Sequence, residues 1–266
     1  MEDITEGDVL VRRDGYVHVI TLNRPESLNA VTIDMHHTLE QVFRDVDRDP
    51  ESRAVVITGA GRGFCSGGDL KAMRKGGRAG FSHNRPVVKS AGRELFFVML
   101  EMEKPTVAAV NGPAIGLGAT IALAMDSIIM AEEACMGDAH VDAGLVAGDG
   151  GTVLWPVLVG PHRAKEMLLS GRKVYGPEAG EIGLVNHVVP RDEVLPAAMD
   201  LAATFAAKAP WACRATKIAI NYDLVQRATL LLEIAMSYEG QSARKEDHKE
   251  ALAAFVEKRP AEFTGR

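Results

Sequence analysis

The sequence predicts an α/β protein whose C-terminal part is helical. Short β-branched runs alternate with stretches of helical periodicity through the first 190 residues, and only helical patterns follow them. Two buried strands also share one local plan, in which a strand runs into a glycine-rich loop and then into a helix. With 266 residues, 47% of them apolar, the chain is long enough to bury a large core. We expect a core over residues 1–200 and a helical region over 201–266.

The first predicted elements are a hairpin and a helix. The runs 9–12 and 17–22 are β-branched and flank Asp14-Gly15, a pair typical of tight turns. From Thr32 the apolar residues recur every three or four positions until Asp49-Pro50 ends the pattern. Further strands are expected at 54–58, 106–110, 127–131 and 184–189, and further helices after Asp69, at 87–102, from Gly116, at 150–159, 161–170 and 192–209, and from 211 onward.

Charge and cysteine content exclude several classes of function. Thirty Lys and Arg against 36 Asp and Glu give a net charge of −6, which disfavours a nucleic-acid partner. The three cysteines form no CxxC pair, so neither a disulfide framework nor a structural metal is indicated. No apolar run of about 18 residues occurs, and the first residues lack the apolar core of a signal peptide. We expect a cytoplasmic protein without a membrane partner.

The duplicated plan is the most informative feature of the sequence. It occurs as AVVITGAGRGFCSGGDL (54–70) and as TVAAVNGPAIGLGATIALAMD (106–126). The first N–H groups of a helix have no acceptor within the helix, so such a place binds an anion or a polarised oxygen. A dinucleotide site is disfavoured because Phe64 and Ile121 stand where a third glycine is needed. No nucleophile elbow surrounds Ser66. Two tight turns without a ligand remain the alternative.

These segments together resemble the crotonase (enoyl-CoA hydratase/isomerase) superfamily, and the similarity covers nearly the whole chain. The resemblance implies a spiral of ββα turns with a helical C-terminal trimerisation region, and trimers that pair into hexamers. The motifs that carry it are LNRP (22–25) with Asn29-Ala30, ITGAGRGFCSGGDLK (57–71), KPTVAAVNGPAIGLGATIALAMD (104–126), AGLVAGDGG (143–151) and EALAAFVEKRPAEF (250–263).

The resemblance also implies an acyl-CoA thioester substrate, with coenzyme A as part of the substrate and no other cofactor. Its carbonyl oxygen would accept hydrogen bonds from the backbone N–H groups of Gly68 and Leu117, which would stabilise an enolate. Lys258 resembles a lysine that meets the CoA phosphates of a neighbouring subunit. The other positions that the resemblance assigns to substrate binding are Ala30, Ser66, Asp69, Leu70, Gly116 and Thr120.

The sequence departs from the hydratases of this superfamily at both acid–base positions. Where they carry two glutamates, this chain has Thr120 and His140. A neutral hydroxyl cannot deprotonate water as a carboxylate does, so syn-hydration should be weak. An imidazole titrates near neutrality and serves as acid or base. Asp149 follows His140 by nine residues on a GDGG turn, and we expect these two residues to perform the proton transfers.

Two alternative functions remain. The β-diketone hydrolase branch, typified by 6-oxocamphor hydrolase, has His and Asp at this spacing and a segment similar to VLWP (153–156), but it does not use CoA. The retained FCSGGDL segment resembles the CoA-thioester loop and favours an acyl-CoA enzyme. The second alternative is a family member that binds acyl-CoA without catalysis.

Some candidate residues are expected to have structural roles. Asp138 and Asp142 flank His140 at two-residue spacing, but the segment has a loop pattern and we expect neither to take part in the chemistry. Glu239 corresponds to a position used in the diketone hydrolase, yet its polar surroundings in the sequence predict a solvated side chain. Cys65 is expected to be a buried small residue and not a nucleophile.

Overall fold

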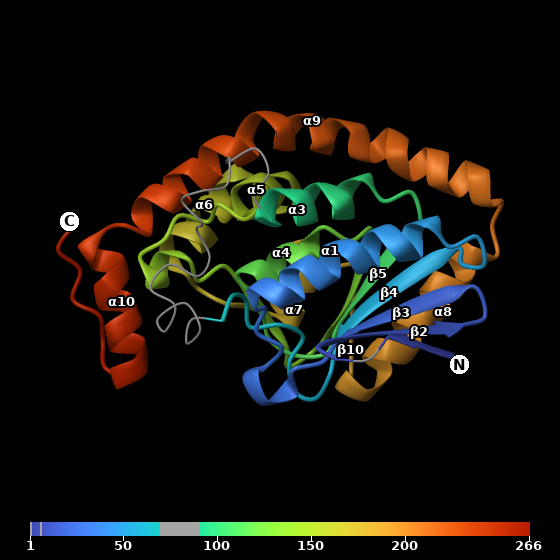
Figure 1. Ribbon diagram of the computed structural model, residues 1–266, viewed down its shortest axis with the longest axis horizontal. Helices are drawn as coiled ribbons and strands as arrows, with labels where there is room; N and C mark the ends of the chain where they lie inside the picture. Colours follow the sequence, from blue (N-terminus) through green and yellow to red (C-terminus); the bar gives the residue numbers. More distant parts are fainter. Residues whose placement is uncertain (1, 6, 70–90) are drawn as a thin grey trace.

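The computed structural model describes residues 2–5, 7–69 and 91–266, and Figure 1 shows its arrangement. The main sheet has seven strands in the order β1-β2-β3-β4-β5-β7-β10. The first three strands are antiparallel, and β3, β4, β5, β7 and β10 are parallel. Their bounds are β1 Glu2–Thr5, β2 Val9–Asp14, β3 Val17–Leu22, β4 Ala54–Gly59, β5 Thr106–Val110, β7 Ser127–Ala131 and β10 His187–Val189.

A small second sheet positions the candidate site. It has the order β6-β8-β9, with β6 at Ala114–Ile115, β8 at Cys135–Gly137 and β9 at Val174–Tyr175. β6 and β8 are parallel, and Gly116 just beyond β6 donates a backbone hydrogen bond of 2.9 Å to Gly137 O. The loop after β5 and the residues that follow β8 are therefore held side by side.

Helices cover both faces of the main sheet and extend beyond it. β4, β5 and β7 are buried along their whole length, with α8 on one face and α1 and α4 on the other (Figure 1). The long helix α9 packs over α3 and α5, and α10 lies near the C-terminus (Figure 1). The α-helices are α1 Ile33–Arg48, α3 Ala91–Glu101, α4 Leu117–Leu123, α5 Gly151–Val159, α6 Pro161–Ser170, α7 Gly176–Glu181, α8 Val194–Ala206, α9 Pro210–Ser242 and α10 Glu246–Glu257.

Most predicted elements are confirmed. The hairpin forms with Asp14 opposite Val17, and Thr32 caps α1 by accepting a hydrogen bond of 3.2 Å from Met35 N. Strand 184–189 was predicted too long, because only its last three residues pair with β7. β1, β6, β8, β9 and α7 were not predicted. The predicted helix after Asp69 and residues 87–90 of the predicted helix 87–102 lie outside the described residues.

Candidate active site

The two glycine-rich loops lie against each other. They follow β4 and β5, which are neighbouring parallel strands, so both loops leave the sheet at the same edge. Cys65 N donates to Pro113 O at 3.0 Å, and Ile115 N donates to Cys65 O at 2.9 Å. At Gly118 an added Cβ would lie 2.2 Å from Cys65 O, so only glycine permits this approach. The duplicated pattern in the sequence thus forms one structure.

Gly68 and Leu117 both have an available backbone N–H group. Leu117 is the first residue of α4, where an N–H has no acceptor within the helix. Gly68 lies beside Val31, but its own N–H takes no part in the hydrogen bonds between these segments. Val31 N donates to Gly67 O, and Asp69 N donates to Val31 O. Among the described residues, neither Gly68 N nor Leu117 N donates a hydrogen bond. A Cβ built on Gly67 would lie 3.6 Å from Leu117 N, so the two loops are adjacent here.

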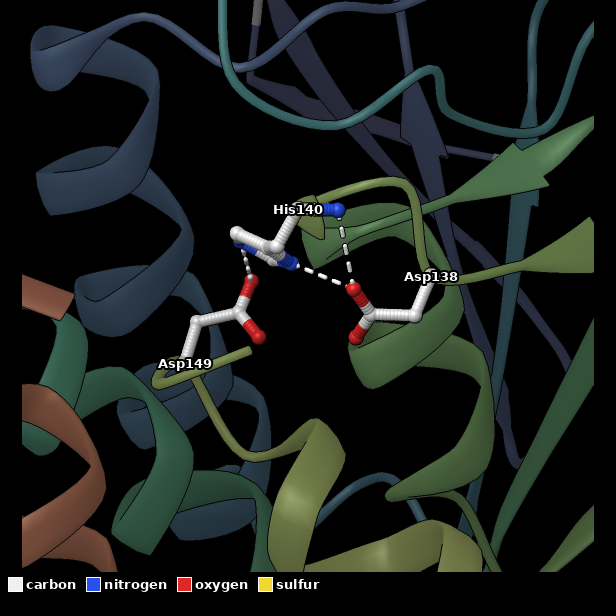
Figure 2. Close-up of side chains that lie close together, drawn as sticks. All are labelled: Asp138, His140 and Asp149. Carbon is white, nitrogen blue, oxygen red and sulfur yellow. Dashed lines mark hydrogen bonds and ion pairs between the residues drawn. The ribbon is translucent and has the colours of Figure 1, made fainter. Parts of the chain in front are cut away.

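His140 lies next to this loop pair, between two carboxylates (Figure 2). Its Nδ1 is 2.6 Å from Asp138 Oδ1, and its Nε2 is 3.5 Å from Asp149 Oδ2. The ring also faces the loop before α4, because a Cβ built on Gly116 would lie 3.5 Å from its Cε1. Asp138, which we did not expect to take part in the chemistry, is the nearer of the two acids to the ring.

Asp149 is held by groups from two helices. Thr120 of α4 donates from Oγ1 to Asp149 Oδ1 at 3.1 Å. Asp149 also precedes Gly150, the N-cap of α5, and the backbone N–H of Gly151 hydrogen-bonds to its carboxylate. The N-terminal end of a helix favours a negative charge. Thr120 therefore has a defined task, which is to orient Asp149.

Glu239 of α9 is a fourth titratable residue near the ring. Its side chain is buried, and a Cβ built on Gly148 would lie 2.5 Å from its Oε2. The prediction of a solvated side chain was wrong, because α9 packs over the loop that contains Asp149. Burial, opposed by the charge of His140 and reinforced by those of Asp149 and Asp138, raises the pKa of Glu239 to about 8. We refer to Asp138, His140, Asp149 and Glu239 as the His140 cluster.

The electrostatics of the His140 cluster favour the imidazolium. Burial alone would lower the pKa of His140, but the charges of Asp149, Asp138 and Glu239 and the hydrogen bond to Asp138 raise it to about 10. Burial raises the pKa of Asp149, against the opposing charge of His140. These charges therefore favour the protonated ring at neutral pH. Asp149 is the largest cause that raises the pKa of His140, and Asp138 is the second.

The same residues could be considered as metal ligands. One oxygen or nitrogen atom each of Asp138, His140 and Asp149 lies within 4.8 Å of the others. Within residues 2–5, 7–69 and 91–266, this is the one group of three such side chains that could hold a metal ion. However, each ring nitrogen of His140 already faces a carboxylate oxygen, and a metal ligand needs a nitrogen without a proton. The arrangement favours a hydrogen-bonded imidazolium over a metal centre.

Comparison with known proteins identifies the family of the chain. The family described as enoyl-CoA hydratase/isomerase matches residues 12–266. The chain belongs to that family. Like its relatives, this member of the enoyl-CoA hydratase/isomerase family is an enzyme. The short-chain-enoyl-CoA hydratase of Clostridium acetobutylicum is 34% identical, with 96% of this chain and 97% of that protein covered.

Two other similar proteins are named for different reactions on CoA thioesters. The 1,2-epoxyphenylacetyl-CoA isomerase of Escherichia coli is 34% identical over 94% of this chain and 95% of that protein. The crystal structure of carnitinyl-CoA hydratase from Mycobacterium avium superimposes with a TM-score of 0.86 and 34% identity, covering 98% of this chain and 100% of that chain. The crotonase-type α/β fold predicted from the sequence is confirmed.

The substrate-binding positions expected from the family resemblance fall into two groups. Ala30, Ser66 and Asp69 come together, since Ser66 N donates to Leu28 O at 2.9 Å and Asp69 N to Val31 O at 3.1 Å. Asp69 also pairs with Arg24 at 3.3 Å. Lys258 is exposed at the end of α10, away from these bonds. Leu70 lies outside the described residues.

Two further side chains that the sequence singled out lie apart from the proposed chemistry, and the expected burial of Cys65 is confirmed. Cys65 is fully buried, and burial raises the pKa of its thiol to about 12, so it is unsuited to act as a nucleophile. Asp142, the other acid that flanks His140, lies beside Gly171, where an added Cβ would be 2.5 Å from its Oδ2. It is therefore turned toward a different part of the molecule than Asp138.

In residues 2–5, 7–69 and 91–266, we find no helix with the length and apolar character needed to span a membrane.

Proposed function

We propose that this enzyme transfers protons next to the thioester carbonyl of an acyl-CoA. The N–H groups of Gly68 and Leu117 bind the carbonyl oxygen and stabilise the enolate. His140 and Asp149 donate and accept the protons. The single observation that carries the proposal is the position of the His140 ring, which lies against Gly116, the N-cap residue directly before the Leu117 donor.

The free N–H groups support the first half of this proposal. A thioester oxygen between two donors gains most as it becomes an enolate oxygen, because the donors are already oriented when the charge develops. The relatives act on CoA thioesters by name, as in the short-chain-enoyl-CoA hydratase and the 1,2-epoxyphenylacetyl-CoA isomerase. An acyl-CoA substrate follows from membership of this family.

The charges of the His140 cluster support the second half. A protonated His140 suits a donor, and a neighbouring carboxylate suits an acceptor. We infer that Asp149 accepts the proton from carbon while His140 supplies one to the product. Because Thr120 and His140 replace the two glutamates of hydratases, we infer that the enzyme is better suited to isomerisation or proton exchange than to hydration.

Deuterium exchange tests this proposal without knowledge of the product. Butyryl-CoA, crotonyl-CoA and a 3-enoyl-CoA would each be incubated with the enzyme in D₂O and analysed by mass spectrometry. We expect incorporation of deuterium, or double-bond migration, for at least one thioester, and the loss of that activity in His140→Ala. Exchange of none of them, together with no calorimetric binding of any of these thioesters at millimolar concentration, would contradict the proposal.

A CoA-independent β-diketone hydrolase is the second candidate. The buried Glu239 beside His140 and Asp149 favours it, since the sequence resemblance links all three positions to that branch. A cyclic β-diketone in the same substrate panel separates the two functions. Cleavage of the diketone without any acyl-CoA binding would support the hydrolase.

We also propose that the protein assembles into a trimer or hexamer. α9 exposes Leu230, Ile234 and Tyr238, which are spaced four residues apart on one side of the helix. Burial of this side against another copy would remove it from water. Sedimentation should give a mass three or six times that of the chain, and a stable monomer at micromolar concentration would contradict the assembly. Lys258 would then meet the CoA phosphates bound to a neighbouring copy.

A further inference from the structure

Asp138 contacts His140 more closely than any other residue of the cluster. Its Oδ1 makes two hydrogen bonds with that one residue: it lies 2.6 Å from Nδ1, and it accepts from the backbone N at 3.1 Å. These two bonds close a small ring, which fixes the rotation of the imidazole relative to its own backbone (Figure 2). Asp138 is itself only 1% exposed and directly follows β8, so its position is set by strand pairing.

The contact also decides which ring nitrogen can exchange its proton. An ionised carboxylate only accepts hydrogen bonds, so Nδ1 must carry the proton that lies between it and Asp138. Nε2 is left on the side of Asp149, at the longer distance of 3.5 Å. A proton that leaves the imidazolium for the substrate therefore leaves from Nε2, and Nδ1 keeps its own proton throughout.

We propose that Asp138 is the positioning residue of this enzyme, which holds His140 with a proton on Nδ1 so that every proton exchanged with the substrate passes through Nε2. This proposal rests on the proposed function of His140. In the transfer step the Nε2–H bond breaks, a new bond to hydrogen forms on the substrate, and the electron pair stays on Nε2. Asp149 is then free to accept the other proton and does not serve as the orienting acid.

The charged groups around the ring come from three elements. Asp138 follows β8, Asp149 precedes α5, and Glu239 lies on α9. Asp142 is two residues from His140 on the opposite side from Asp138, but it faces Gly171. Asp142→Asn is therefore a matched control for Asp138→Asn, because it removes the same charge at the same sequence distance without touching the ring.

Nitrogen-15 NMR of the histidine rings tests the proposal in the free protein. Wild type at neutral pH should show a strongly deshielded Nδ1–H signal for His140, protected from exchange with water and assigned by its loss in His140→Gln. This measurement needs neither substrate nor a variant of Asp138, so it is independent of the proposed reaction. A His140 ring that lacks a protected Nδ1–H in folded wild type would overturn the proposal.

Kinetics distinguish positioning from a merely structural role. For whichever acyl-CoA of the exchange panel is active, Asp138→Asn should lower kcat by about 10²-fold, leave KM little changed and move the pH profile to lower pH. Asp142→Asn should change none of these. If Asp138→Asn folds and retains the wild-type pH profile and kcat, the proposal is wrong. If wild type shows the protected Nδ1–H but turns over no acyl-CoA, the proposed function is contradicted. The proton on Nδ1 and its contact with Asp138 are supported in that case.

Discussion

The candidate site has a thioester side, built from backbone groups, and a proton-transfer side, built from side chains. On the thioester side, the proposed donors are backbone N–H groups of Gly68 and Leu117, and the shape of two glycine-rich loops places them. On the proton-transfer side, the proposed working groups are side chains of Thr120, Asp138, His140 and Asp149. The first side depends on where the backbone turns and the second on which residue occupies each position.

This difference explains how one family can include hydratases and isomerases. The loops need glycine at positions such as Gly118, where any side chain would collide with Cys65 O, and they leave Leu117 free to vary. The acid–base positions carry no such restriction, so a change there alters the reaction while the binding of the thioester is preserved. The family resemblance implies that in this chain Thr120 and His140 stand where hydratases carry two glutamates.

Removal of the proton-transfer side should have the largest effect. His140→Ala and Asp149→Asn should each lower kcat on the active acyl-CoA by about 10²-fold or more, the usual size of a general acid–base contribution. Binding of the same acyl-CoA, measured by calorimetry, should stay close to that of wild type. If His140→Ala lost acyl-CoA binding by the same factor as kcat, His140 would instead act by binding the thioester.

Removal of one backbone donor should lower the rate by a similar factor and should also change the binding of the acyl-CoA. Gly68→Pro deletes the N–H, and loss of one such donor typically costs a factor of about 10² to 10³ in rate. Unlike His140→Ala, it should also weaken acyl-CoA binding. Circular dichroism and calorimetry on the same sample check that the fold is retained. Full activity in a folded Gly68→Pro enzyme would show that the carbonyl oxygen lies elsewhere.

Thr120→Ala should have a modest effect. Thr120 contributes one neutral hydroxyl that orients Asp149 at 3.1 Å, and such a bond is worth about 0.5 to 1.5 kcal/mol. A decrease in kcat of about tenfold or less is expected, with Thr120→Ser restoring most of it. A loss as large as that of Asp149→Asn would mean that the hydroxyl itself contacts the substrate.

Glu239 should affect stability and its pH dependence more than activity on acyl-CoA. Its pKa is raised from 4.5 to about 8, so across this window the folded protein binds more protons than the unfolded chain. The free energy of unfolding should therefore fall as pH rises through the window. Glu239→Gln should reduce that fall, and urea unfolding at several pH values measures it. A steeper fall in Glu239→Gln would contradict the assigned burial. His140 adds a fall of the same sign between 6.5 and about 10.

The sequence pattern was sufficient to predict the two units of strand, glycine-rich loop and helix, because each such signal is contained within about 20 residues. The donor role of Gly68 and Leu117 came from the family resemblance and stays a prediction. The contact of Asp138 with His140 was not predicted, because it depends on the strands β8 and β6. These have three and two residues, too few for alternating hydrophobicity to indicate a strand. Glu239 was misjudged because a charged residue is not expected on a buried helix face, although it follows Ala228, Leu232 and Ala235 on the buried face of α9 at spacings of three and four residues. Its burial depends on packing against Gly148, far away in the sequence.

The most direct test of the central claim is crotonyl-CoA hydration by wild type and by His140→Ala. Two carboxylates suit the activation of water, and in this chain a threonine and an imidazolium stand in their place. The account predicts slow hydration by wild type compared with exchange or isomerisation of the active acyl-CoA, and the loss of all these activities in His140→Ala. Fast hydration that survives His140→Ala would contradict the account, because the proton transfers would then run through other residues.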